Sequence, residues 1–217
     1  MNIIQIYQKY QIMPSLQLHM LRVAAVVKII SDNINQPTDT SSMITACLLH
    51  DMGNILKFDL QLFPEFLAPQ GQAYWQMVKD EFLQKYGSDE HQATITIAHE
   101  LGVNQRVIEL IEAVGFTHAK DNFLSEDLAK KIVIYADMRV HPKGVVSLEA
   151  RLQDGHRRFQ LQKSKEERED YFQEMAGYLK KIEQQIFEHC RLKPEDITDK
   201  KILVFIDELR SFNKARD

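Results

Sequence analysis

The chain has 217 residues, of which 44% are hydrophobic and 27% are charged, so it is long enough to bury a core and has the composition of an ordinary globular protein. Its formal net charge of -4, without a basic block, argues against binding to duplex nucleic acid and leaves a small anionic ligand possible. The N-terminus does not resemble a signal peptide and no stretch of about 18 apolar residues occurs, so we expect no membrane span and a cytoplasmic location. The separation of Cys47 and Cys190 predicts neither a disulfide framework nor a zinc finger.

Hydrophobic periodicity near 3.6 residues dominates the first half of the chain and predicts helices. A short helix is expected over residues 3–11, and Pro14 precedes a longer one over about 16–30. The turn at residues 37–41 offers a Thr or Ser cap for the apolar run 43–49. Residues 54–71 are expected to form a loop with a short helix.

The second half continues the helical pattern, which predicts an all-α protein. Helices are expected over 73–86, over 89–101 with Asp89 as cap, and over 104–114 with Asn104 as cap. After a loop at 115–125, a helix beginning at Ser125 should contain Asp137 and continue to about residue 141. Further helices are expected over 147–162, from a capping box at 164–167 to about 190, and after Thr198. We expect one domain, with a core over about 15–160 and C-terminal helices over about 161–215 packed on it.

The pair His50-Asp51 ends an apolar run, where an imidazole beside a carboxylate is a poor choice for packing alone. His19 and Asp137 lie in two other apolar helical runs. Imidazole and carboxylate groups are ligands of divalent metals. The four residues are therefore candidates for one metal site.

This pattern resembles the HD-domain superfamily of metal-dependent phosphohydrolases. The resemblance rests on His19 with Arg22-Val23-Ala24 after it, on His50-Asp51 with Gly53, and on Asp137; residues 136–152 (ADMRVHPKGVVSLEARL) also resemble the segment after the closing Asp of bacterial members. It implies a compact all-α bundle and a divalent ion (Mn, Fe, Co, Mg, Ni or Zn) held by His19, His50, Asp51 and Asp137.

Some relatives bind a second metal with two further histidines. His91 fits the first of these positions, whereas His118 lies about one turn beyond the second. The resemblance therefore leaves open whether His91 and His118 bind a second ion or act as proton donors to a substrate.

A phosphate group needs cations nearby, and four residues are candidates for binding it or for supporting the metal ligands: Arg22, Lys57, Arg139 and Lys143. Arg22 lies one helical turn after His19, and it is equally suited to orient Asp51. A lysine that is common in the family is replaced here by Asn54, so no lysine role is carried over.

We therefore predict a metal-dependent phosphohydrolase that acts on a nucleotide or related small phosphoester through a metal-activated water. One alternative is a regulatory module that binds a nucleotide or other ligand and keeps the metal without turnover. Another is a di-iron oxygenase of the HD type. The sequence leaves both open, together with the possibility of a homo-oligomer.

Overall fold

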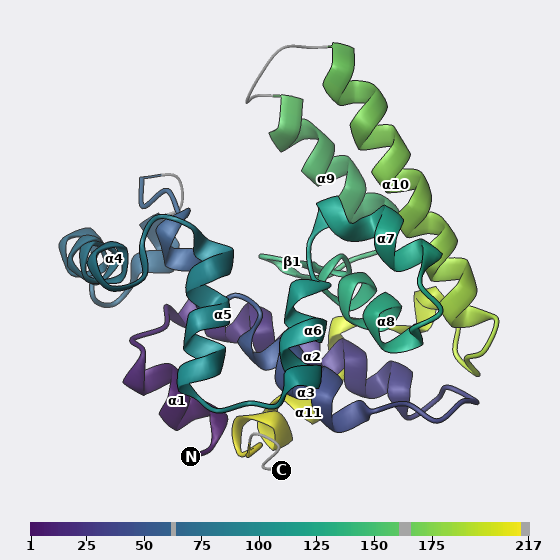
Figure 1. The fold of residues 1–217 in the computed structure, drawn as a ribbon, viewed down its shortest axis with the longest axis horizontal. Helices are drawn as coiled ribbons and strands as arrows, with labels where there is room; N and C mark the ends of the chain where they lie inside the picture. The colour runs from purple at the N-terminus through teal and green to yellow at the C-terminus, as the bar shows by residue number, and fades with distance from the viewer. Residues whose placement is uncertain (62–63, 161–165, 214–217) are drawn as a thin grey trace.

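The computed structural model describes residues 1–61, 64–160 and 166–213, and their fold is all-α, as predicted (Figure 1). The α-helices are α1 (Ile3–Lys9), α2 (Pro14–Ser31), α3 (Thr40–Leu49), α4 (Gln72–Tyr86), α5 (Glu90–Glu100), α6 (Gln105–Glu112), α7 (Ala119–Leu124), α8 (Leu128–Asp137), α9 (Leu148–Gln160), α10 (Glu166–Phe187) and α11 (Asp199–Arg210). Short 3-10 helices are η1 (Asn54–Leu56), η2 (Pro64–Leu67), η3 (Phe116–His118) and η4 (Pro194–Asp196). The strands β1 (Val140–His141) and β2 (Gly144–Val145) form an antiparallel hairpin.

Helix α2 lies at the centre of the fold because it is apolar on nearly all sides. Its residues 23–27 are completely buried. It packs against α3, α8 and α11, and α3 packs in turn against α6 and α8. The three helices α2, α3 and α8, which carry the four predicted metal ligands, are thus mutual neighbours.

The helix ends follow the predicted capping chemistry with one exception. The side chains of Asp89, Asn104 and Thr198 accept backbone N–H groups at the starts of α5, α6 and α11, as predicted. At α3 the predicted Thr or Ser cap is wrong, because Asp39 accepts the N–H of Ser42 instead. Asp and Ser are equally good caps, so the local pattern could not choose between neighbouring candidates. The capping box predicted at residues 164–167 falls on side chains outside the described part.

Two segments differ from the sequence prediction. The predicted loop 115–125 contains η3 and α7, and α8 begins at Leu128 with Asp127 as its cap, not at Ser125. Asn122 stabilises the new helix by donating a hydrogen bond to the carbonyl of Ala113. After Asp137 the chain forms the β1–β2 hairpin where a continuing helix and a turn were expected.

The C-terminal third packs on the helices that precede it. Helix α10 contacts α7 and α8, while α9 and α10 project from the body of the molecule as a pair (Figure 1). Helix α11 returns to α2, and the N–H of Ile3 donates to the carbonyl of Phe212, so the described ends of the chain lie together.

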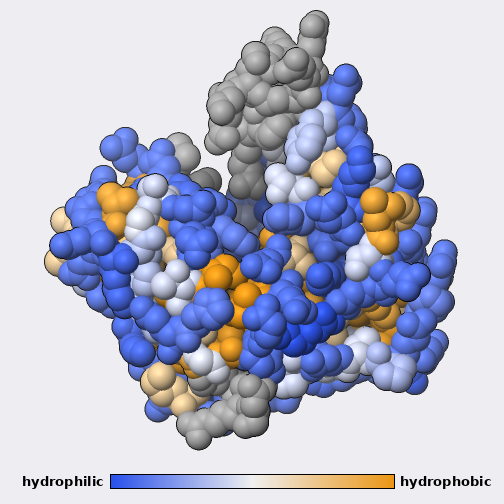
Figure 2. Space-filling view, viewed as in Figure 1, coloured by the Kyte–Doolittle hydropathy of each residue, from blue (hydrophilic) through white to orange (hydrophobic). Residues whose placement is uncertain are grey.

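The face shown in Figure 2 is mostly hydrophilic, and its apolar residues form small separate patches. Over the described ranges, no helix has both the length and the apolar character that crossing a bilayer requires.

Candidate metal centre

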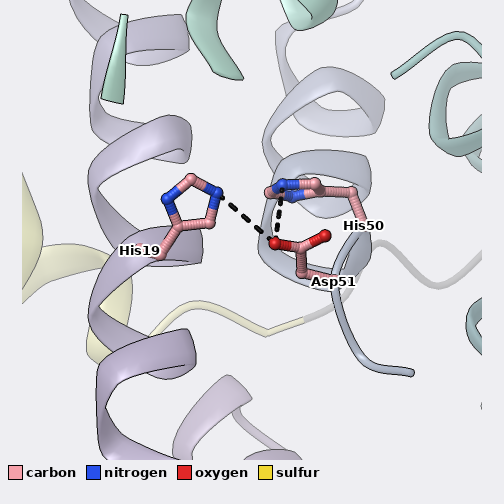
Figure 3. Close-up of side chains that lie close together, drawn as sticks. All are labelled: His19, His50 and Asp51. Carbon is pink, nitrogen blue, oxygen red and sulfur yellow. Dashed lines mark ion pairs between the residues drawn. The ribbon is translucent and has the colours of Figure 1, made fainter. Parts of the chain in front are cut away.

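Three packed helices bring the four predicted ligands to one place. His19 lies in the second turn of α2, His50 is the C-cap of α3, and Asp137 is the last residue of α8. Adjacent residues within a helix point about 100° apart. The pair His50-Asp51 follows Leu49, the last residue of α3, and there the carboxylate of Asp51 lies beside the ring of His50 (Figure 3).

The distances between these groups suit a single ion. His19, His50 and Asp51 offer ligand atoms that all lie within 4.8 Å of one another. Oδ2 of Asp51 lies 3.5 Å from Nε2 of His19 and 3.7 Å from Nε2 of His50. Oδ1 of Asp137 lies 3.1 Å and 3.5 Å from the same two nitrogens. Both imidazoles thus present Nε2 to both carboxylates.

His50 is held in the orientation that a metal site requires. Its Nδ1–H donates to the carbonyl of Cys47 at 2.8 Å, which leaves Nε2 for the site. That Nε2 is buried and makes no hydrogen bond within the described part of the chain. Its position 3.7 Å from Oδ2 of Asp51 and 3.5 Å from Oδ1 of Asp137 fits a ligand of a divalent ion.

The carboxylates also control the charge of the site. Burial lowers the pKa of His50, but Asp51 and Asp137 outweigh burial and raise that pKa to about 9. Burial alone would raise the pKa of Asp137, but the rings of His19 and His50 hold it well below its ordinary value. Without a metal, a proton on His50 therefore compensates the negative charge, and a bound cation would take the place of that proton.

The HD-domain family model matches residues 17–137, more than half of the chain, and the match begins just before His19 and ends at Asp137. The chain belongs to the HD-domain family. This family is generally one of metal-dependent hydrolases that bind divalent ions. No curated protein and no solved structure matches the chain significantly.

Gly53 holds the turn after His50-Asp51 against the start of α5. Its N–H donates to Oγ1 of Thr94, and a Cβ at this position would lie 2.2 Å from the carbonyl oxygen of Glu90. Only glycine allows this approach. The contact brings the start of α5, which carries His91, up to the turn that carries Asp51.

The ring of His91, at the start of α5, lies near the ring of His118 in η3. Their ring centroids are 6.5 Å apart, with His91 exposed at the start of α5 and His118 half-buried in η3. The two histidines expected to act together are thus neighbours, although η3 replaces the loop in which His118 was expected. Whether they bind an ion remains a prediction.

The four candidate cations have different surroundings. The side chain of Arg22 is 18% exposed and contacts the carbonyl of Pro142 at 3.3 Å and Oδ1 of Asp199 at 3.8 Å. Lys57 is exposed and pairs with Glu90 at 3.2 Å, and Lys143 is exposed in the hairpin turn.

Arg139 is placed differently, because it is 2% exposed and its guanidinium is occupied by the protein. It donates to the hydroxyl of Tyr135 and to the carbonyls of Val146, Pro194 and Ile197. These bonds join the segment after Asp137 to the segment before α11. The arrangement favours a supporting role for Arg139 over direct phosphate binding.

Asn54, which replaces a lysine common in the family, contacts Asp51, and the sequence did not predict this contact. Its Nδ2–H donates to Oδ2 of Asp51 at 2.9 Å. The signal available in the sequence was the spacing, since residues three apart share one face of a helical turn.

Proposed function

We propose that the chain is a metal-dependent phosphohydrolase whose divalent ion is held by His19, His50, Asp51 and Asp137. The substrate is a nucleotide or a related small phosphoester. The buried Nε2 of His50, which lacks a hydrogen bond and faces two carboxylates, is the observation that carries this proposal. Membership of the HD-domain family supports the same reaction class.

The protein groups suit this chemistry. A divalent ion lowers the pKa of a water and neutralises charge on a phosphate group. Two neutral imidazoles and two carboxylates balance its charge and leave further positions for water and substrate. The side chains of His19, Asp51 and Asp137 are each between 17% and 19% exposed, whereas that of His50 is 3% exposed. The site is therefore open on the side away from His50.

Cations and hydrogen bonds complete the arrangement. Arg22 lies one turn beyond His19, where its charge can attract a phosphate group that approaches the ion. The bond from Nδ1 of His50 to the Cys47 carbonyl keeps the imidazole oriented while a substrate enters and a product leaves.

The test is a screen of the Mn²⁺-loaded protein for phosphate release from nucleoside mono-, di- and triphosphates. Wild-type protein should release phosphate, and Asp51→Asn should reduce the rate by more than about 100-fold, the upper end of the loss expected when only a residue supporting a ligand is removed. Asp32→Asn is the matched control, because Asp32 pairs with Lys28 at the far end of α2 and should keep full activity.

The alternatives predict other outcomes of the same screen. A sensing module would bind a nucleotide without releasing phosphate. A di-iron oxygenase would contain iron and consume oxygen. Either result, in a protein that binds its metal fully, would contradict the proposed hydrolysis.

A further inference from the structure

Asn54 contacts Oδ2 of Asp51, the carboxylate oxygen that lies near both candidate histidine ligands. It begins η1, three residues after Asp51, and its Nδ2–H donates to Oδ2 of Asp51 at 2.9 Å. This is the same oxygen that lies 3.5 Å from Nε2 of His19 and 3.7 Å from Nε2 of His50. The amide thus selects one orientation of the carboxylate.

The other end of the same amide is unsatisfied. Oδ1 of Asn54 is buried and accepts no hydrogen bond from the described residues. Exchanging the two ends would turn Oδ1 toward the Asp51 carboxylate and remove the donor, so the hydrogen bond itself fixes the assignment. A buried carbonyl oxygen without a donor costs stability.

Folding alone therefore does not favour an amide at this position. An apolar side chain of the same size would avoid the buried acceptor. What the amide provides is a hydrogen bond to a carboxylate that points toward two imidazoles. Such bonds hold ligands of a metal in place and raise metal affinity.

We propose that Asn54 is a positioning residue that holds Asp51 in the orientation required to bind the metal, at a cost to the stability of the metal-free fold. This inference rests on the metal centre of the proposed function but not on the hydrolysis. It predicts that replacing Asn54 changes metal affinity and stability in opposite directions. A residue with a structural role alone would lower stability and leave metal affinity unchanged.

The experiment compares the full-length wild-type protein with Asn54→Leu and Asn54→Ala. Mn²⁺ alone is titrated calorimetrically, and the midpoint of urea unfolding is measured in excess chelator. Both variants should bind Mn²⁺ about 10- to 100-fold more weakly than wild type, which is the loss expected for a residue that supports a ligand. The unfolding midpoint of Asn54→Leu should exceed that of wild type.

Asn33→Leu is the matched control. Asn33 is a partly buried amide that donates to the carbonyl of Ile29 at 2.9 Å, and it lies beyond the end of α2, far from His19. Its replacement should lower the unfolding midpoint and leave the Mn²⁺ affinity unchanged.

Three results would overturn the proposal: Mn²⁺ affinity of Asn54→Leu equal to that of wild type, weakening by Leu but not by Ala, or a wild-type protein without Mn²⁺ affinity. Weaker Mn²⁺ binding in Asn54→Leu but not in Asn54→Ala would show that the size of the leucine side chain, and not the loss of the amide, lowers the affinity. A protein that binds Mn²⁺, loses affinity in both variants and hydrolyses no phosphoester would support the role of Asn54 and contradict the proposed function.

Discussion

His50 links metal binding to pH, because its ring can hold either a proton or a metal ion at Nε2. Asp51 and Asp137 raise its pKa to about 9 against the opposing effect of burial. Below that pH the metal-free protein carries the proton, so binding a cation must release it. We therefore expect the apparent affinity for Mn²⁺ to rise about tenfold per pH unit as the pH approaches about 9 and to level off above it.

Calorimetry in two buffers of different ionisation enthalpy measures this release directly. At pH 7 about one proton should leave per bound ion. The control is His99→Gln, because His99 is exposed on α5 and should leave the number of released protons unchanged. Binding at pH 7 without proton release would show that His50 carries no exchangeable proton in the metal-free protein and would contradict this linkage.

Arg22 is a candidate cation that lies one helical turn from the ligand His19 and keeps part of its side chain exposed. Its contacts with Asp199 and the Pro142 carbonyl hold the guanidinium near the hairpin. Arg22→Gln should weaken the binding of inorganic phosphate to the Mn²⁺-loaded protein by about tenfold, the loss expected for one charge-assisted contact. Lys28→Gln, which removes a cation from the same helix, should have little effect. Equal phosphate affinity in all three proteins would exclude Arg22 from anion binding.

At the level of single residues, the sequence was informative where the residue type conflicted with its surroundings. An imidazole and carboxylates in apolar helical runs pointed to one site, and the structure places His19, His50, Asp51 and Asp137 together. The surroundings of Arg139 could not be predicted, because its burial depends on carbonyls 55 and 58 residues away.

Among the elements, the hairpin after Asp137 depends on a buried cation for its position. Arg139 joins this segment to the residues before α11 through four partners. Arg139→Met should lower the free energy of unfolding by about 3 kcal/mol or more, because two buried and two partly buried acceptors lose a charged donor. Urea unfolding measures the loss.

Arg210→Met provides the comparison, since Arg210 is half-exposed and its contact with Asp207 is 3.8 Å long. Exposed pairs of this kind contribute less than about 1 kcal/mol. If both variants unfolded with the same free energy, Arg139 would not be the residue that holds the hairpin.

Long helices were predictable and short elements were not. Periodicity predicted α2, which has 18 residues, and periodicity together with the caps Asp89 and Asn104 predicted α5 and α6, which have 11 and 8 residues. Helix α7 has six residues and each strand of the hairpin has two, which is too short for a hydrophobic period to emerge. Their formation depends on contacts such as the bond from Asn122 to Ala113, which no local pattern reveals.

For the whole molecule, the number of bound ions remains a prediction. His91 and His118 face each other. Gly53 holds the start of α5, which carries His91, against the turn after His50-Asp51. If they bind a second ion, the fully loaded protein should contain about two metals per chain, as in two-metal hydrolases. His91→Ala and His118→Ala should each lower that ratio toward one. A ratio near one in wild type, unchanged in both variants, would leave a single metal and make these histidines candidates for proton donation.

Helices α2, α3 and α8, from distant parts of the chain, should assemble one metal site. The most direct measurement is an anomalous difference map from crystals of the protein grown with Mn²⁺. A peak is expected within bonding distance of Nε2 of His19, Nε2 of His50, and carboxylate oxygens of Asp51 and Asp137. A well-ordered map with Mn²⁺ bound elsewhere, and none between these four side chains, would contradict it.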